Sequence, residues 1–155
     1  MTNEGMPELQ PSNVSHKPLI LIVDDEMDMR IFMSTLFETS GYRPVAVRDG
    51  RQGLAKAANL KPQLIILDVM MPGEGGALMY KALKSDPELR KIPVVMCSAV
   101  EQVSFDRYLK MLNARLETPL PSPEGYMEKP PDPEALLQLA QRILAAESHS
   151  GDGPG

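Results

Sequence analysis

The chain has 155 residues, of which 43% are hydrophobic and 24% are charged, proportions that are ordinary for a soluble globular domain. Its 16 basic and 21 acidic residues give a net charge of −5, which provides no overall basic field for nucleic acid. A single cysteine excludes an intramolecular disulfide framework and a multi-cysteine zinc site. No apolar run reaches the roughly 18 residues of a membrane span, and the polar first residues do not resemble a signal peptide. We therefore expect a cytoplasmic protein with neither a membrane nor a nucleic-acid partner.

The two ends of the sequence differ in composition from the middle. Residues 1–17 are polar, include Pro7 and Pro11, and show no apolar periodicity, while residues 148–155 contain three glycines and one proline. Such segments bury too little apolar surface to fold by themselves. The sequence therefore predicts a flexible N-terminal arm at residues 1–17, one folded domain at residues 18–147 and a flexible C-terminal tail at residues 148–155.

Within the predicted domain, short apolar runs alternate with stretches of helical periodicity. Continuous apolar runs of this length are typical of strands that are buried on both faces of a parallel sheet. Strands are predicted at residues 19–23, 44–47, 64–67, 92–96 and 126–127. Helices are predicted at about residues 26–39, 49–60, 78–83 and 100–116 and from residue 133 onward. Five strands that alternate with five helices predict a doubly wound α/β fold.

Residues that begin and end helices support this division. Asp49, with Gln52 three positions later, forms the pattern of a capping box. Asp132 followed by Pro133 is typical of the start of a helix, and Gly41 stands where the first helix would end.

A proline-rich segment interrupts the alternation before the last strand. Six of the 15 prolines fall between Pro119 and Pro133, so the stretch from Glu117 to Gly125 is predicted to be neither helix nor central strand. The helical pattern before it runs on to Leu116. We therefore expect an extended fourth helix followed by a long, stiff loop.

Polar residues follow four of the five predicted strands. Asp24 and Asp25 follow the first strand, Asp68 the third, Ser98 the fourth and Lys129 the fifth. The carboxyl ends of parallel strands meet at one edge of a sheet, where ligands bind in open α/β folds. Three carboxylates at that edge would repel each other unless a cation neutralised them, and an oxygen ligand set suits Mg²⁺. Without histidine or cysteine among these residues, zinc is disfavoured.

These residue types also provide the parts of a phosphoryl-transfer site. A carboxylate beside a metal ion can attack phosphorus to form an aspartyl phosphate. The metal and Lys129 would neutralise charge on the phosphoryl oxygens, and Ser98 would donate a hydrogen bond. Asp68 is the predicted nucleophile, because it stands alone after the central strand while Asp24 and Asp25 are paired for metal.

Taken in order, these motifs resemble the receiver domain of bacterial two-component response regulators. The motifs are Asp24-Asp25-Glu26, DVMMPGEGG at residues 68–76, Ser98-Ala99 and Lys129-Pro130, and the resemblance spans about residues 17–146. It implies a flavodoxin-like sheet of order 2-1-3-4-5. It also implies that a histidine kinase or phosphotransfer protein donates a phosphoryl group to Asp68.

The resemblance further implies roles for individual residues. Asp25, Asp68 and the backbone carbonyl of Met70 would ligate Mg²⁺ directly, and Asp24 would act mostly through water. Ser98 and Lys129 would contact the phosphoryl group. Ser98 and Tyr126 would form the conformational switch. The Lys129-Pro130 peptide bond would be cis.

The resemblance implies that the face from Val100 to Ala146 transmits the signal. After Lys129 only one predicted helix and a tail remain, so we expect a stand-alone regulator that acts on an unknown downstream protein. It would be a monomer, or a dimer when phosphorylated. The alternative is a degenerate receiver used as a docking module without phosphorylation. An aspartyl phosphatase is disfavoured, because its second acid would occupy the position of Met70.

The residues two positions after the nucleophile and after the serine are Met70 and Val100. In the family these positions flank the route of the hydrolytic water. Neither apolar side chain can orient a water molecule by hydrogen bonds. The sequence therefore predicts a long-lived phosphoryl group.

Overall fold

The computed structural model of the chain describes residues 17–71 and 75–152, with the backbone alone for residues 149–152. It contains a five-stranded parallel sheet in the order β2-β1-β3-β4-β5. The strands are β1 (Leu19–Val23), β2 (Arg43–Val47), β3 (Leu64–Leu67), β4 (Val94–Ser98) and β5 (Gly125–Glu128). The doubly wound fold and its strand order are therefore confirmed.

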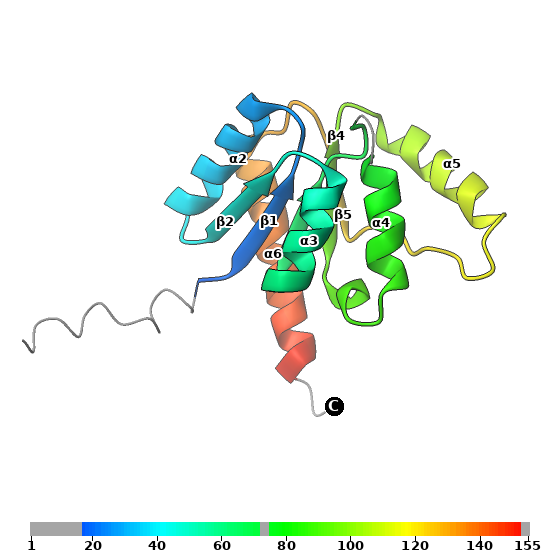
Figure 1. Cartoon of the computed structure of the whole chain (residues 1–155). Coiled ribbons are helices and arrows are strands. Elements are labelled where there is room, and N and C mark those ends of the chain that lie inside the picture. The colour runs from blue at the N-terminus through cyan, green and yellow to red at the C-terminus, as the bar shows by residue number, and fades with distance from the viewer. Residues whose placement is uncertain (1–16, 72–74, 153–155) are drawn as a thin grey trace, which may run out of the picture.

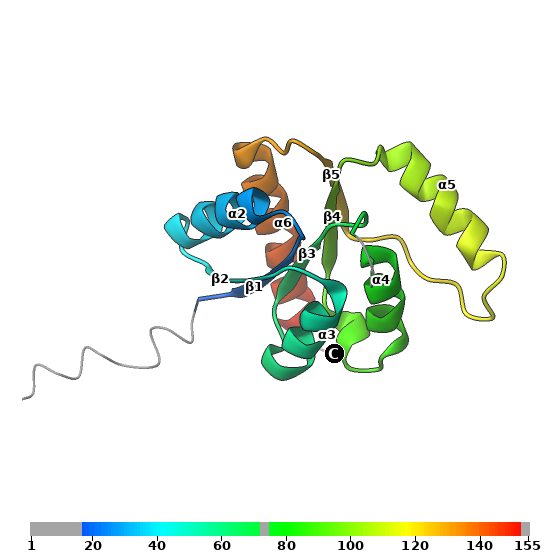
Figure 2. The same ribbon diagram turned by 45° about the horizontal axis from the view of Figure 1, so that its top comes forward.

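Helices cover both faces of the sheet (Figure 1). The described residues form five α-helices and one 3-10 turn: α2 (Met27–Thr39), α3 (Gly50–Leu60), α4 (Gly76–Ser85), η2 (Leu89–Lys91), α5 (Gln102–Asn113) and α6 (Pro133–Asp152). Helices α2 and α6 lie on one face, and α3 and α4 lie on the other. Helix α5 projects beside the β5 edge, and a long connection returns from it to the sheet (Figure 2).

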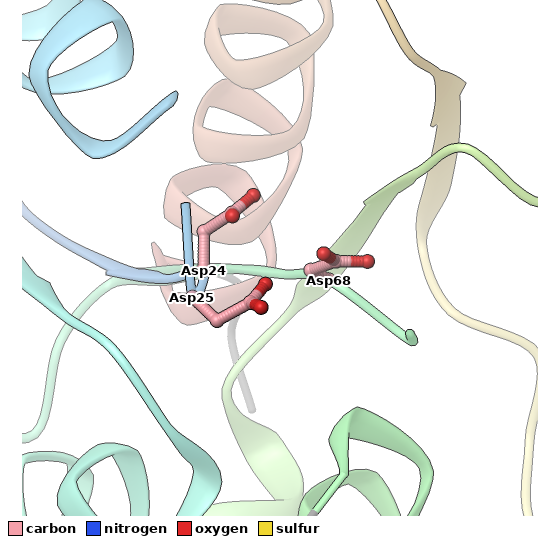
Figure 3. A group of neighbouring side chains, drawn as sticks. All are labelled: Asp24, Asp25 and Asp68. Atoms are coloured by element: carbon pink, nitrogen blue, oxygen red, sulfur yellow. The ribbon is translucent and has the colours of Figure 1, made fainter. Parts of the chain in front are cut away.

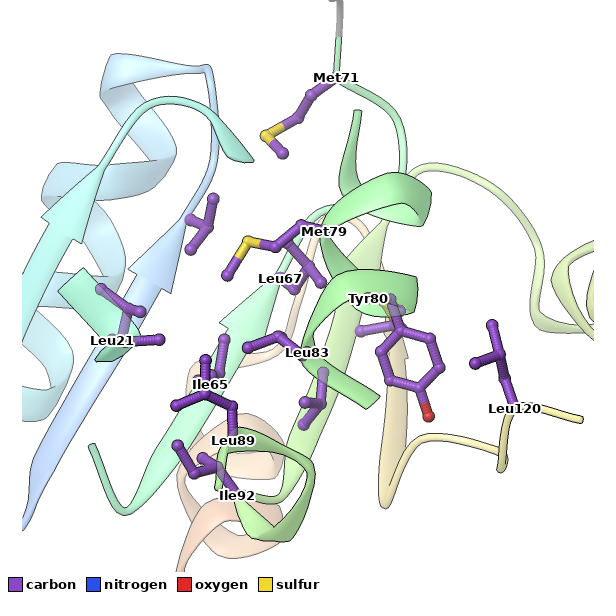
Figure 4. Close-up of a cluster of buried hydrophobic side chains, with 14 of the residues drawn as sticks. Leu21, Ile65, Leu67, Met71, Met79, Tyr80, Leu83, Leu89, Ile92 and Leu120 are labelled. Atoms are coloured by element: carbon purple, nitrogen blue, oxygen red, sulfur yellow. The ribbon is translucent and has the colours of Figure 1, made fainter. Parts of the chain in front are cut away.

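The apolar strands feed two separate cores, because successive side chains of a strand point to opposite faces. Leu21 and Ile65 point toward α3 and α4, in the core drawn in Figure 4. Ile20 and Ile66 point toward α2 and α6. All five residues of β1 are buried, which explains why its sequence shows no polar alternation.

The predicted helix caps are present. The side chain of Asp49 accepts a hydrogen bond from the backbone N–H of Gln52 at 2.8 Å, and Asp132 does the same for Ala135 at 2.8 Å. Gly41 has a φ of +95°, a left-handed conformation that favours glycine after a helix. These local signals place the starts of α3 and α6 and the end of α2 where the sequence predicts them.

Two helix ends differ from the prediction. Helix α5 ends at Asn113 instead of continuing to Leu116, because the Asn113 side chain turns to the following loop. Its Nδ2 donates to the carbonyl of Leu120 at 2.9 Å, and its Oδ1 accepts from the Leu120 N–H at 2.7 Å. Helix α6 continues to Asp152, so residues 148–152, predicted as tail, are helical. The predicted arm at residues 1–17 lies, apart from residue 17, outside the described residues.

The loop at residues 114–124, called the strap below, is anchored to the domain at three points. Asn113 holds its Leu120, whose side chain is 7% exposed and lies beside Tyr80 (Figure 4). The Tyr80 hydroxyl donates to the carbonyl of Pro121 at 2.6 Å. Glu124 exchanges two hydrogen bonds with the backbone of Val94, at 2.7 and 2.9 Å. The strap is thus a structural part of the α4 side of the core.

This anchoring predicts that Leu120→Ala lowers the free energy of unfolding by about 2–5 kcal/mol, the range for replacing a buried leucine by alanine. Urea denaturation followed by far-ultraviolet circular dichroism measures the change. Leu78→Ala is the matched control, because Leu78 is 58% exposed on α4 and its loss is expected to change stability by less than about 0.5 kcal/mol. Equal changes in the two variants would contradict an anchored strap.

Candidate functional site

Three aspartates meet where adjacent strands end. Asp24 and Asp25 follow β1, Asp68 follows β3, and these strands pair in register. The Asp24 N–H donates to the Val47 carbonyl at 3.1 Å, and the Asp68 N–H donates to the Val23 carbonyl at 3.0 Å. The last hydrogen bonds of the sheet therefore fix both backbones. One carboxylate oxygen from each aspartate lies within 4.8 Å of the others (Figure 3).

A glycine lets helix α4 begin directly against the phosphoacceptor candidate. A Cβ placed on Gly76 would lie 1.9 Å from the carbonyl oxygen of Asp68, closer than two atoms can approach. The first turn of α4 and the end of β3 therefore pack without any intervening side chain. In the sequence this glycine stands out only as part of the DVMMPGEGG motif, which does not reveal the contact with Asp68.

Lys129 brings its ammonium group into the acidic cluster. Its peptide bond to Pro130 is cis, as predicted, and its backbone N–H donates to the Ser98 carbonyl at 2.8 Å. The Nζ atom lies 2.9 Å from Asp24 Oδ2, 2.9 Å from Glu26 Oε1 and 3.1 Å from Asp68 Oδ2. One ammonium thus contacts three carboxylates.

Burial and charge act in opposite directions in this cluster. Burial raises the pKa of the Asp24 carboxyl, although Lys129 and the Glu26 N–H stabilise its charged form. Burial also disfavours the charged form of Lys129, but its three carboxylate contacts outweigh that effect and raise its pKa above the ordinary value. The ammonium therefore stays charged at neutral pH.

The cluster fits a hard divalent cation. Lys129 supplies one positive charge to the carboxylates of Asp24, Asp25, Glu26 and Asp68, so negative charge remains. Asp24 Oδ2 is buried and, among the described residues, accepts no hydrogen bond of good geometry. The atoms of the cluster that could ligate a metal ion are all carboxylate oxygens, which hard cations prefer as ligands. An acidic triad of this kind is typical of a receiver metal site.

A cavity of about 410 Å³ opens over the cluster. It is wide enough to admit a phosphoryl group together with water. Its lining combines the acidic residues with apolar side chains and the lysine: Asp25, Glu26, Met29, Asp68, Met70, Ala99, Lys129 and Pro130.

Ser98 and Tyr126 meet at the loop that joins β4 to α5. Ser98 is fully buried at the end of β4, and its hydroxyl oxygen accepts a hydrogen bond from the Val100 N–H at 3.1 Å. The Tyr126 hydroxyl donates to the carbonyl of Val100 at 2.5 Å, and its ring lies against Phe105 with centroids 5.4 Å apart. Both predicted switch residues therefore hold the same backbone segment, and their switching role remains a prediction.

Glu26 is a site residue whose role is not predicted from the sequence, although it belongs to the first motif. Glu26 precedes the first turn of α2, and its carboxylate contacts Lys129 from the rim of the cavity. The only signal in the sequence is a third acid directly after the acidic pair.

The family model of the response regulator receiver domain matches residues 20–141 of this chain. The chain belongs to the response regulator receiver family. The polar-differentiation response regulator DivK of Brucella anthropi is 37% identical over 136 residues, which cover 88% of this chain and 98% of DivK. Protein PilH of Pseudomonas aeruginosa is 30% identical over 126 residues, which cover 81% of this chain and 97% of PilH.

A solved structure supports the same assignment. The chemotaxis protein CheY4 of Vibrio cholerae is 28% identical, with a TM-score of 0.71, and the match covers 82% of this chain and 98% of CheY4. This receiver is a phosphorylatable two-component response regulator, a signalling protein rather than an enzyme. Receivers of this family partner with histidine kinases. Among the described residues, no helix is long and apolar enough to cross a membrane.

The contacts of Lys129 predict its contribution to stability. Lys129→Met leaves the buried carboxylates of Asp24 and Asp68 without their cation and is expected to lower the free energy of unfolding by about 3–5 kcal/mol without divalent ions. Added Mg²⁺ is expected to stabilise this variant more than the wild type, because it replaces the missing charge. Thermal denaturation with and without Mg²⁺ measures both effects.

Lys81→Met is the matched control, because Lys81 is exposed on α4. Its stability and its response to Mg²⁺ are expected to equal those of the wild type. An identical response of the Lys129 and Lys81 variants would show that the ammonium does not balance the carboxylates.

Proposed function

We propose that this receiver accepts a phosphoryl group on Asp68 from a histidine kinase or phosphotransfer protein in a Mg²⁺-dependent reaction, in the cytoplasm. One observation carries the proposal. The Asp68 carboxylate is only 4% exposed, yet it borders an open cavity, contacts the Lys129 ammonium and clusters with two further aspartates. A stabilising role alone does not account for so much unbalanced negative charge at a cavity.

Asp25, Asp68 and the carbonyl of Met70 would hold Mg²⁺, with Asp24 acting mostly through water. When bound, the ion would neutralise charge on the phosphoryl oxygens. The Met70 N–H donates to Asp68 Oδ1 at 2.9 Å and so orients the carboxylate. An Asp68 oxygen would form the new bond to phosphorus as the bond to the donor histidine nitrogen breaks. Lys129 and Ser98 would then hold the phosphoryl oxygens.

The signal would leave through the face formed by residues 100–146. Ser98 and Tyr126 both bind Val100, so a hydroxyl that moves toward the phosphoryl group would change this contact. A groove of about 600 Å³ lies between α5 and the strap, with Tyr126 and Leu120 in its lining. We propose that phosphorylation shifts the population of two arrangements of this face and thereby alters binding of a downstream protein, or of a second copy.

Phosphorylation of the purified protein by a small phosphodonor tests this function. Incubation with acetyl phosphate and Mg²⁺ is expected to add the mass of one phosphoryl group to the intact wild type, and to add nothing without Mg²⁺. Asp68→Asn is expected to remain unlabelled, because an amide is not a nucleophile. Intact-mass spectrometry measures the adduct, and circular dichroism verifies the folding of the variant.

Labelling that persists in Asp68→Asn would place the phosphoryl group elsewhere. Failure of the folded wild type to be labelled, both by acetyl phosphate and by a histidine kinase, would favour the docking module that needs no phosphorylation.

The lifetime of the phosphoryl group provides a separate prediction. The Met70 side chain is 62% exposed at the cavity and cannot hold a hydrolytic water by hydrogen bonds. In Met70→Asn the phosphoryl group on Asp68 is expected to be hydrolysed a few-fold faster than in the wild type, which corresponds to about 1 kcal/mol in the activation barrier. Loss of label from purified phosphoprotein measures the rate. Met111→Asn on α5, where Met111 is 61% exposed, is expected to leave the rate unchanged.

A further inference from the structure

Lys129 has one contact that the proposed chemistry does not use. Two of its three carboxylate partners, Asp24 and Asp68, are buried, with side chains 1% and 4% exposed. The third is Glu26, whose side chain is 61% exposed. Glu26 does not belong to the three aspartates whose oxygens cluster as a metal site.

The Lys129 ammonium donates hydrogen bonds to Glu26 Oε1 and Asp68 Oδ2, and Asp24 Oδ2 lies 2.9 Å away as an ion-pair partner without a hydrogen bond of good geometry. A phosphoryl oxygen that binds this ammonium therefore competes with carboxylates that are already in contact with it. Water can solvate the exposed carboxylate of Glu26 once it is released, whereas Asp24 and Asp68 would remain buried without their cation. Glu26 is therefore the partner that is released at the lowest free energy.

We infer that Glu26 is a positioning residue that holds the Lys129 ammonium at the cavity in the unphosphorylated receiver and competes with the phosphoryl group for it. The inference rests on the proposed phosphorylation of Asp68. It adds a regulatory element to that site, because the strength of the Glu26–Lys129 pair sets how readily Lys129 becomes available to the phosphoryl group.

Glu26→Gln is expected to be labelled by acetyl phosphate about 2- to 5-fold faster than the wild type at saturating Mg²⁺, the range given by a solvent-exposed ion pair. Part of this gain would come from weaker repulsion of the anionic donor. Asp28→Asn controls for that part, because it removes one negative charge from the first turn of α2 without touching the Lys129 ammonium. The initial rate, followed by intact mass, is expected to be higher in Glu26→Gln than in Asp28→Asn.

Glu26→Asp separates contact from charge. Aspartate keeps the negative charge, but its side chain is one methylene shorter and draws the carboxylate away from Nζ. If the contact competes with the phosphoryl group, Glu26→Asp is labelled faster than the wild type. If Glu26 acts only by charge, Glu26→Asp matches the wild type, and the inference is overturned.

A measurement without phosphorylation tests the contact directly. The ¹⁵Nζ resonance of Lys129, observed by nuclear magnetic resonance with Mg²⁺ alone, is expected to shift in Glu26→Gln and to stay in place in Asp28→Asn. An unchanged resonance in Glu26→Gln, or labelling no faster than in Asp28→Asn, overturns the inference while the proposed function stands. A wild type that is never labelled overturns the proposed function, and the competition with it.

Discussion

The attraction between one ammonium and a group of crowded carboxylates is the interaction on which the rest of this structure depends. Asp24 and Asp68 are buried close to each other, an arrangement that is opposed by the repulsion between their charges and by the loss of hydration. It persists because sheet hydrogen bonds fix both backbones and because Lys129 reaches them from the far side of β4. The remaining negative charge makes this cavity suitable for a divalent cation, in keeping with an acidic triad that is typical of a receiver metal site.

The protein combines a rigid site with a less tightly held surface beside it. Strands β1 and β3 are fully buried, and Gly76 allows α4 to pack directly against the end of β3. Helix α5, by contrast, buries only Phe105 and Leu109. Segments with few buried contacts reorganise at the lowest free energy, so a change at the site is expected to appear first in α5 and its connections. The strap limits how far α5 can be displaced, because Asn113 joins the end of α5 to Leu120 in the core.

The sequence alone predicts most of the site, because each site residue follows an apolar strand whose position is easily recognised. The carboxyl ends of parallel strands meet at one edge of the sheet, so the sequence predicts that Asp24, Asp68 and Lys129 lie close together. The contact of Glu26 could not be predicted, since Glu26 lies beyond the end of β1 at the start of α2, where the strand order does not determine the direction of its side chain. The end of α5 was missed because the apolar period continues to Leu116, whereas the Asn113 amide binds the strap. The length of α6 was missed because Ser148 and the glycines beyond it have the composition of a tail.

Lys129 also connects the site to the surface that would be read by a partner. The residue before it, Glu128, accepts a hydrogen bond from the N–H of Gln102 at 3.0 Å, at the first turn of α5. The N–H of Lys129 itself binds the carbonyl of Ser98. In the exchange inferred above, Lys129 would move within a backbone that holds both the start of α5 and the end of β4. Because such an event would replace one partner of the ammonium by another, its net free energy would be small. A small difference suits a switch that must be reversed when the phosphoryl group is lost.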